Sequence, residues 1–401
     1  MNILKSLGGT RMTPKRYLEI ERLRAIAVIW VILHHSVAFS PYVNQLFKQG
    51  WTGVDLFFVI SGFVVAKSFD SKLPTQDSSS NLMDKLKFYG PHLKTFWGRR
   101  IMRIVPLALG WILISSALWQ WVPDWQAFAP YEKGYSREII SFLTLQINFI
   151  NLHQASKFFH YWSLAVEEHF NLLLPFLLVL TRNRSYQLWA SIMGILMVIF
   201  VIRPYLTRSS DLAQSVYFLH SVSLNRFDSL LAGVVLYLLI SGGVLANDET
   251  PLSRSSRLIK ILFCYLSIYL LWVMPYFYKP EYLFRYNFPI FWFLSSYLVY
   301  AAQINQGLVA NFYFLNPIFH WIGKRSYGLY VTHMPAQWLH TSLNIHLQSL
   351  QTHFPSFSAE GWNAAAYLIL LFSLTELSWW LMEKPGIYLG NQWFAKNSRL
   401  N

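Results

Sequence analysis

"RAIAVIWVILHH", residues 24–35, is an apolar run that begins with an arginine and ends with two histidines. The apolar character extends over about residues 20–40, enough for a helix to cross a membrane core of ~30 Å. Arg24 and His35 are about three helical turns apart, so they share one helix face with a spacing of ~16 Å. His34 points ~100° away. Burying an ionisable group in a membrane is costly, so this stretch predicts a functional site inside a spanning helix.

The composition of the chain excludes an ordinary soluble domain. Of its 401 residues, 54% are hydrophobic and 13% charged, whereas soluble domains carry about 25% charged residues. Ten further apolar segments lie at about 51–69, 101–122, 138–152, 162–181, 187–207, 226–246, 258–277, 287–304, 317–342 and 363–382. These runs are continuous and lack the alternation of a β-barrel. The sequence therefore predicts an all-α polytopic membrane protein.

The charge and cysteine content narrow the function further. The formal net charge is +14, and lysines and arginines that fix membrane topology explain it better than nucleic-acid binding does. The only cysteine is Cys264, which lies inside an apolar run. We therefore expect no disulfide framework, no cysteine-based metal site and no nucleic-acid partner.

Loop charges predict the topology. Residues 1–16 form a basic arm without a cleavable signal, and 67–100 are also rich in lysine and arginine, so both should be cytoplasmic. If the short segment 138–152 crossed the membrane, Arg182 and Arg184 would lie outside. We therefore expect about ten spans, with 138–152 re-entrant or interfacial, a basic amphipathic surface segment at 82–98, and a cytoplasmic tail at 387–401 after the last span.

A pair of carboxylates is the second unusual feature. "HYWSLAVEEHF", residues 160–170, places Glu167 and Glu168 inside a spanning segment, near the expected level of His35. A buried carboxylate must be paired or protonated. Two interpretations remain open at this point: an acid–base partner that orients a histidine, or a structural salt bridge to Arg203 or Arg226.

Other charged residues gather toward the two expected faces of the membrane. Asp55 in "GVDLFFVISGF", with Arg226 and Asp228 in "NRFDSLLAG", should lie toward the outer side. The inner side should hold Arg99, Arg100 and Arg103 in "RRIMRIVP", with Lys324 and Arg325 in "GKRSYGLYVTHMP". The inner group is either a topology signal or an anion site, since arginine forks grip phosphates. His333 should lie at mid-depth, in either a structural or a functional role.

Seven motifs together resemble a known family. They occur in the order "RLRAIAVIWVILHH", "GVDLFFVISGF", "FWGRRIMRIVP", "YWSLAVEEHF", "NRFDSLLAG", "GKRSYGLYVTHMP" and "MEKPG", within residues 17–386. This series is similar to that of the acyltransferase-3 family of integral membrane O-acyltransferases. The resemblance implies a membrane acyltransferase domain over 17–386 that moves an acyl group, usually acetyl from acetyl-CoA, onto hydroxyls of sugars in surface polysaccharides, lipopolysaccharide or secreted small molecules. It also implies the cytoplasmic (inner) membrane of a bacterium.

The resemblance assigns roles residue by residue. The family's arginine, ten-residue spacer and histidine fall on Arg24 and His35, its paired glutamates on Glu167 and Glu168, and its basic element on Arg99, Arg100 and Arg103. Two departures concern the acceptor more than the chemistry: His169 and Asn171 stand where the family commonly has Gln and Tyr. Some members carry a C-terminal esterase-like domain, which we do not expect in this chain.

These observations lead to one main hypothesis. Arg24, the inner arginines and Lys324 would hold the phosphates of acyl-CoA, with acetyl the expected group and succinyl or longer groups open. His35 would act as general base or accept the acyl group itself, assisted by Glu167 and Glu168 as catalytic carboxylates. A carbohydrate or glycoside acceptor would enter near Asp55, Arg226 and Asp228. No metal is expected, membrane lipid surrounds the protein, and the sequence does not specify the oligomeric state.

A transporter or flippase of a lipid-linked sugar or small solute is the alternative. Charges at mid-membrane are typical of such proteins as well. The two halves of the chain, however, show no matching repeat and no paired broken helices. The sequence therefore favours the enzyme.

Overall fold

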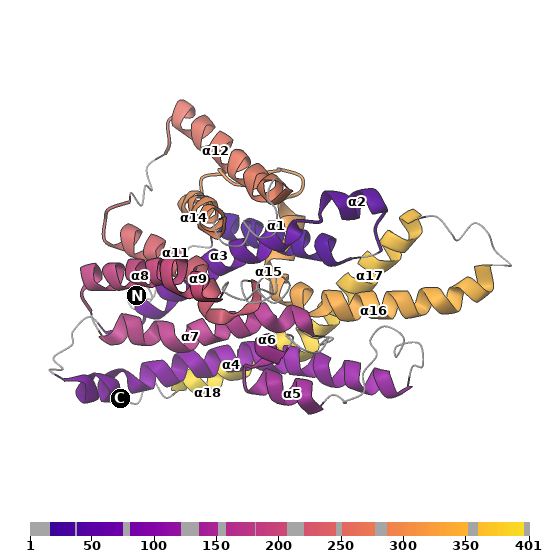
Figure 1. The fold of residues 1–401 in the computed structure, drawn as a ribbon, viewed down its shortest axis with the longest axis horizontal. Coiled ribbons are helices and arrows are strands. Elements are labelled where there is room, and N and C mark those ends of the chain that lie inside the picture. Colours follow the sequence, from indigo (N-terminus) through magenta and orange to yellow (C-terminus); the bar gives the residue numbers. More distant parts are fainter. Residues whose placement is uncertain are drawn as a thin grey trace, which may run out of the picture.

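The computed structural model describes residues 17–36, 38–74, 81–121, 136–150, 158–180, 182–206, 220–245, 251–276, 287–351 and 360–396. These parts of the chain are helical and contain no strand (Figure 1). Seven segments within them are long and apolar enough to cross a membrane: Gly50–Asp70, Leu82–Leu118, Phe159–Leu180, Arg184–Leu206, Ser223–Ser241, Arg254–Tyr276 and Asn363–Phe394. The chain is therefore an all-α multi-pass membrane protein, as predicted, while the number of ten spans stays a prediction.

The first half of the chain contains these helices: α1 (Leu18–His35), α2 (Pro41–Leu46), η1 (Gly50–Thr52), α3 (Gly53–Asp70), α4 (Leu82–Trp121), α5 (Ser136–Leu143), α6 (Ile147–Ile150), η3 (Phe159–Tyr161), α7 (Trp162–Leu180), α8 (Arg184–Met197), η4 (Val198–Ile202) and α9 (Arg203–Leu206). The second half contains α11 (Ser223–Ser241), α12 (Arg254–Val273), η5 (Met274–Tyr276), α14 (Phe288–Ile304), α15 (Asn316–Lys324), α16 (Ser326–Gln351), α17 (Glu360–Ser378), η7 (Trp379–Glu383) and α18 (Lys384–Lys396).

Helix α3 packs against α11 with their backbones almost in contact. A Cβ atom on Gly62 of α3 would lie 2.0 Å from the carbonyl oxygen of Leu230, and one on Gly233 of α11 would lie 2.2 Å from that of Val59. Only glycine permits so close an approach, and small residues are the usual means by which membrane helices pack. The contact fixes how the charged residues at the beginnings of α3 and α11 face each other.

Helix α1 is held in the same way from two sides. A Cβ atom on Gly53 would lie 2.5 Å from the carbonyl oxygen of Ala27, and one on Gly323 of α15 would lie 2.0 Å from that of Glu21. These contacts fix the rotation of α1, and with it the direction of the face that carries Arg24 and His35, which are both partly exposed. The opening stretch of the sequence is thus a tightly packed helix of the bundle.

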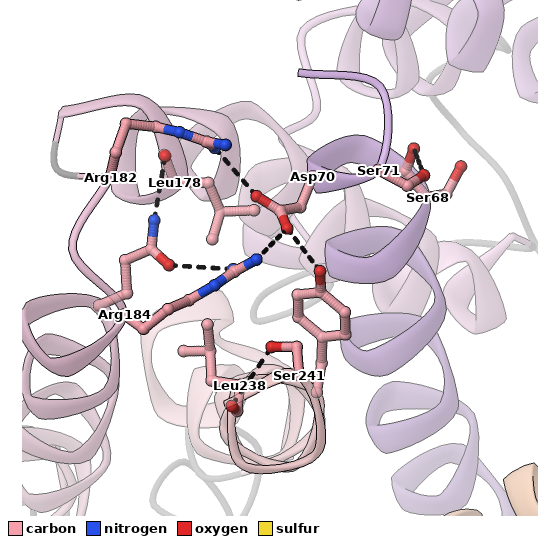
Figure 2. A network of polar contacts seen from close by, with 10 residues as sticks. Ser68, Asp70, Ser71, Leu178, Arg182, Arg184, Leu238 and Ser241 are labelled. Carbon is pink, nitrogen blue, oxygen red and sulfur yellow. Dashed lines mark hydrogen bonds and ion pairs between the residues drawn. The ribbon is translucent and has the colours of Figure 1, made fainter. Parts of the chain in front are cut away.

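One end of the bundle is held by a polar network around Asp70 (Figure 2). Asp70, at the end of α3, accepts hydrogen bonds from Arg182 at 2.9 Å, from Arg184 at 2.5 Å and from the Tyr237 hydroxyl at 2.5 Å. The end of α3, the beginning of α8 and the end of α11 therefore meet at one end of the bundle. The chain between Asp70 and Arg182 must leave this end and return to it.

This return fits the expectation for segment 138–152. Helices α5 and α6, with 8 and 4 residues, are too short to span a membrane. The chain therefore crosses the membrane in α4 and crosses back in α7. Had α5 and α6 formed a third crossing, Arg182 would lie far from Asp70. Within its described part, residues 138–150, the segment does not cross. Residues 1–16 and 397–401, predicted to be cytoplasmic, lie outside the described parts.

Three boundaries differ from the sequence expectations. The predicted surface segment 82–98 is not separate, because it continues into the next span as the 40-residue helix α4. The predicted single span 317–342 is divided at Arg325, whose side chain bonds Glu376 and stacks on Trp379. Residues 387–396, expected in the tail, form most of α18, which packs on α4 where Gly98 meets Phe394. The boundaries at Arg325 and at α18 thus involve tertiary contacts, which local hydropathy does not encode.

Candidate active site

A cavity of about 140 Å³ lies among α1, α3, α4, α7 and α16, and we call it the arginine cavity. Its polar lining consists of Arg24, Ser61, Arg100, Arg103, Ser163, Glu167, Ser326, Tyr327 and Tyr330. The remaining lining is apolar, with aromatic and branched side chains from α3 in the majority. The cavity thus brings together residues that are far apart in sequence, and charges of both signs, inside the helical bundle.

The paired glutamates meet at a single arginine. Arg100 donates hydrogen bonds to Glu167 at 2.8 Å and to Glu168 at 2.9 Å. Ser61 donates to the same oxygen of Glu167 at 2.6 Å, and Asn171 donates to Glu168 at 3.1 Å. The alternative in which Glu167 pairs with Arg203 or Arg226 is therefore wrong, since its partner is Arg100.

The other two arginines of the cavity are not neutralised in this way. Neither Arg24 nor Arg103 forms an ion pair with any residue in the described parts of the chain. Glu167 is the carboxylate that lines the cavity, and Glu168 bonds Arg100 from outside the lining, so three guanidinium groups meet two carboxylates. The excess positive charge suits an anionic ligand, because arginine forks bind phosphate oxygens strongly.

The structure places only some of the predicted donor-binding residues at this cavity. Arg24, Arg100 and Arg103 line it, whereas Arg99 does not. Lys324 is exposed at the end of α15, and Arg325 is bound to Glu376 at 2.9 Å. Arg99 is adjacent to Arg100 on α4, so its side chain leaves the helix ~100° away.

His35 lies in a cluster of aromatic rings. Its ring centroid is 4.7 Å from that of His34, 5.5 Å from Phe159 and 5.2 Å from His333. His333 is in turn 5.0 Å from His160. We call His35, His160 and His333 the histidine cluster. It joins α1, η3 and α16, and among the described residues no hydrogen bond, ion pair or ring contact links His35 to Glu167 or Glu168.

Backbone carbonyls fix the tautomers of two of these histidines. Nδ1 of His35 lies 3.0 Å from the carbonyl oxygen of Val31, and Nδ1 of His333 lies 2.6 Å from that of Tyr330. A carbonyl only accepts hydrogen bonds, so in each neutral ring Nδ1 carries the hydrogen and Nε2 the free lone pair. Each ring therefore presents a basic Nε2. Across the described residues, no three His, Cys, Asp or Glu side chains converge as metal ligands would.

Tyr330 connects the histidine cluster with the arginine cavity. It lines the cavity, its hydroxyl lies 2.5 Å from that of Ser163, and it donates to the carbonyl oxygen of His160 at 2.5 Å. Its ring centroid is 5.6 Å from that of His333. The two parts of the site are therefore adjacent, with Tyr330 between them.

The residues predicted for the acceptor side form closed ion pairs. Asp55 binds Arg226 at 2.6 Å and Asp228 binds Arg203 at 2.8 Å, with side chains at most 1% exposed. Arg226 also lies over the ring of Phe288 at 3.9 Å. The two pairs connect α3, α9 and α11, and none of these four charged residues lines the arginine cavity. Contact with an acceptor stays a prediction.

Sequence reasoning missed several residues of the site. It placed His333 at mid-depth without assigning it to the site, and it gave His160, Tyr330 and Ser61 no role. His333 carried the same signal as His35, an imidazole within an apolar run, whereas His160 lies just before the run at 162–181. Tyr330 and Ser61 gave no signal, because hydroxyl groups are common in membrane helices.

Comparison with known proteins identifies the family. The profile of the acyltransferase-3 family, described as "Acyltransferase domain", matches residues 17–384. The chain belongs to this acyltransferase family. The match includes all residues of the arginine cavity and the histidine cluster. No solved structure gives a significant match to the chain.

Two curated relatives come from Staphylococcus aureus. A protein of strain COL, provisionally named O-acetyltransferase SACOL0978, is 25% identical over 351 residues, which cover 82% of this chain and 52% of the relative. O-acetyltransferase OatA of strain NCTC 8325 is 26% identical over 341 residues, covering 81% and 51%. The chain thus spans about half the length of the curated relatives that it matches.

Proposed function

We propose that this protein is an O-acyltransferase of the bacterial cytoplasmic membrane. It would move an acyl group, first of all acetyl, from acyl-CoA on the cytoplasmic side to a hydroxyl of a sugar in a surface polysaccharide, lipopolysaccharide or secreted glycoside. Membership in the acyltransferase-3 family and the names of the curated relatives support O-acetyl transfer. The observation that carries the proposal is the arginine cavity, with its excess positive charge, lying next to the histidine cluster.

The arginine cavity suits the donor. CoA carries several phosphates on its nucleotide half and its thioester at the end of a thin, flexible arm. A cavity of about 140 Å³ is too small for the whole molecule, but it can admit the arm. The phosphates would then stay at the mouth, where Arg103 is exposed, with Arg24 close by. The negative charge of the phosphates would neutralise the excess positive charge of the arginines.

The histidine cluster suits the chemistry of the transfer. The neutral Nε2 of His35 can take the proton of an acceptor hydroxyl while the hydroxyl oxygen attacks the thioester carbonyl. A C–O bond then forms, the C–S bond breaks, and the thiolate of CoA takes up the proton. In the other route His35 attacks first and carries the acyl group. Both routes give the same products, an ester and free CoA.

The proposal is tested with sealed vesicles from cells that express the protein. [14C]Acetyl-CoA is added to inside-out vesicles, which expose the cytoplasmic face, and to right-side-out vesicles. We expect alkali-labile label in the envelope glycan or glycolipid fraction only from the inside-out preparation, and none with the His35→Ala variant. Equal labelling from both preparations would contradict a cytoplasmic donor site, and no labelling from either would contradict acyl transfer.

A further inference from the structure

His333 has a nitrogen without a hydrogen-bond partner among the described residues, and its ring lies next to that of His35. The side chain is 1% exposed, and its Nε2 has no hydrogen-bond partner within the described residues. Nδ1 is committed to the Tyr330 carbonyl at 2.6 Å. Leaving a buried polar nitrogen without a partner costs stability. An unpaired imidazole nitrogen next to the proposed reactive histidine is a candidate for a catalytic base.

If His35 carries the acyl group, it cannot also act as the base for the acceptor hydroxyl. With Nδ1 bonded to the Val31 carbonyl, His35 has a single lone pair, on Nε2. While an acyl group occupies that nitrogen, His35 cannot also remove the proton of the acceptor hydroxyl. A second base must then stand close to His35.

Among the groups near His35, His333 fits this role best. The ring of His34 is 4.7 Å from that of His35, but its side chain leaves α1 about 100° away. The ring of His160 contacts that of His333 at 5.0 Å, and among the described residues it forms no ring contact with His35. The same carboxylate oxygen of Glu167 already accepts hydrogen bonds from Ser61 and Arg100. The hydroxyl of Tyr330 is donated to the His160 carbonyl. His333 offers a neutral imidazole whose ring centroid is 5.2 Å from that of His35.

We propose that the two histidines divide the reaction, with His35 carrying the acyl group and His333 taking the proton of the acceptor hydroxyl. This inference rests on the proposed O-acyl transfer. The difference in accessibility assigns the roles. His35 is partly exposed, so a thioester can reach it, whereas His333 is almost fully buried.

The reaction then has two steps, acylation of His35 and transfer of the acyl group to the hydroxyl. In the first, Nε2 of His35 attacks the thioester carbonyl, the C–N bond forms, the C–S bond breaks, and CoA leaves as a thiolate. His35 is then an acyl-imidazolium that keeps its Nδ1 hydrogen on the Val31 carbonyl. In the second, the hydroxyl oxygen attacks the acyl carbon, its proton moves to Nε2 of His333, and the C–N pair returns to His35. The proton finally passes to the CoA thiolate, which gives the ester and free CoA.

The division makes the two half-reactions separable, and neither measurement needs the natural acceptor. The first is exchange of label between acetyl-CoA and free [3H]CoA, which uses His35 alone. The second is the loss of [14C]acetyl from protein that has been separated from acetyl-CoA, with water and glycerol as the hydroxyl probes. This second step needs the base.

We expect His333→Ala and His333→Gln to keep the exchange within about threefold of the unsubstituted protein and to slow the loss of acetyl about a hundredfold or more, the usual size of general-base catalysis. His35→Ala should lose the exchange and take up no label. His340→Ala is the matched control, because His340 is also buried on α16, two turns further along, and bonds Asn344. It should change neither rate. The Gln variant keeps a polar side chain of similar size in case Ala disturbs the fold.

Three results would overturn the inference. If both His333 variants deacetylate at the normal rate, His333 is structural. If they lose exchange and deacetylation equally while remaining folded, the two histidines do not divide the reaction. If the unsubstituted protein transfers acetyl in vesicles but shows no exchange, transfer is direct and His35 carries no acyl group. Failure of the vesicle transfer itself would instead refute the proposed function.

Discussion

The arginines of this bundle occur in two contrasting settings. Arg203 and Arg226 are each fully buried against one aspartate, at 2.8 Å and 2.6 Å. Arg24, Arg100 and Arg103 instead surround a cavity that only one glutamate shares with them. In the first setting every charge is matched within the protein. In the second there is positive charge left over.

We interpret this difference as one between structural charges and charges that are available to a ligand. A closed pair inside an apolar bundle connects two helices, and losing one partner leaves a buried charge uncompensated. Arginines left unmatched around a cavity are available to a ligand that brings its own negative charge. The contrast predicts loss of folding in one setting and loss of donor affinity in the other.

The two groups of arginines should lie toward opposite sides of the membrane. Cysteine labelling from one side gives an all-or-none test of this arrangement. Single cysteines are placed in a Cys264→Ala background at Ser71 and Ser185, near the Asp70 network, and at Tyr42, which is 87% exposed beyond the other end of α1. An impermeant maleimide added to intact cells should label the Tyr42→Cys variant and leave the other two unlabelled until the cells are opened.

Opposite labelling of Ser71→Cys and Ser185→Cys would show that segment 138–152 crosses the membrane. The two groups of arginines would then not lie toward opposite faces as proposed. Labelling of all three variants in intact cells would instead indicate leaky cells. A cytosolic protein with an exposed cysteine serves as the control for that condition.

Removing one member of a closed pair should cause the largest loss of stability. Arg226→Ala leaves Asp55 buried without its partner, which should cost about 3–5 kcal/mol in the free energy of unfolding. Thermal unfolding in detergent and the amount of inserted protein measure this loss. Replacing both partners by apolar residues, Asp55→Leu with Arg226→Met, should restore much of it. Lys324→Ala, at an exposed position, should stay within about 0.5 kcal/mol of the unsubstituted protein.

If Arg226→Ala folds normally and loses affinity for the acceptor, Arg226 belongs to an acceptor site, as the sequence suggested. The closed pair would then not be a structural connection. Its side chains would have to become accessible during the reaction.

Removing an unmatched arginine should leave the fold intact and weaken the binding of the acyl donor. Arg24→Ala and Arg103→Ala should raise the KM for acetyl-CoA about ten- to a hundredfold, since a charge-assisted bond is worth roughly 1.5–3 kcal/mol. The kcat should change little, because the contact is remote from the reacting atoms. Lysine at either position should restore the KM only in part, since it lacks the bidentate fork.

Arg325→Ala is the control for this prediction, because it removes an arginine that is already paired. Arg325 is already bound to Glu376, so its loss should lower stability and leave the donor KM unchanged. A rise in KM as large as that of Arg24→Ala would return Arg325 to the donor site. Full rescue of Arg24→Ala by lysine would indicate a topology signal in place of a phosphate site.

The glutamates should show the smallest effect. Glu167 lines the arginine cavity and bonds Ser61, whereas Glu168 bonds Asn171 and does not line it. Glu167→Gln should lower kcat/KM about tenfold, or about 1.4 kcal/mol, and Glu168→Gln by clearly less. Steady-state kinetics on equal amounts of inserted protein compare them. The reverse order would transfer the role to Glu168.

Much of this arrangement is visible in the sequence because it depends on local patterns. The apolar runs define spanning helices, the helical period puts Arg24 and His35 on one face, and loop charges predicted that Asp70 and Arg182 lie at the same end. The polar network around Asp70 agrees with that prediction. These features need only periodicity and the preference of basic residues for one side of a membrane.

The choice of partners could not be predicted in the same way. Glu167 could have met any of several arginines, and it binds Arg100, 67 residues earlier in the chain. The approach of His333 to His35 likewise depends on how α16 packs against α1. Such pairings follow from close contacts at glycines and from packing of whole helices, which a single sequence does not reveal.

The part played by His35 is tested most directly by comparing His34→Ala with His35→Ala in the vesicle assay with [14C]acetyl-CoA. The two histidines are adjacent, and their rings lie 4.7 Å apart, so the variants disturb the same place in the bundle. With equal amounts of inserted protein, His35→Ala should give only background labelling, and His34→Ala should keep a substantial part of the activity. Full activity of His35→Ala, or equal loss in both variants, would contradict a catalytic role for His35.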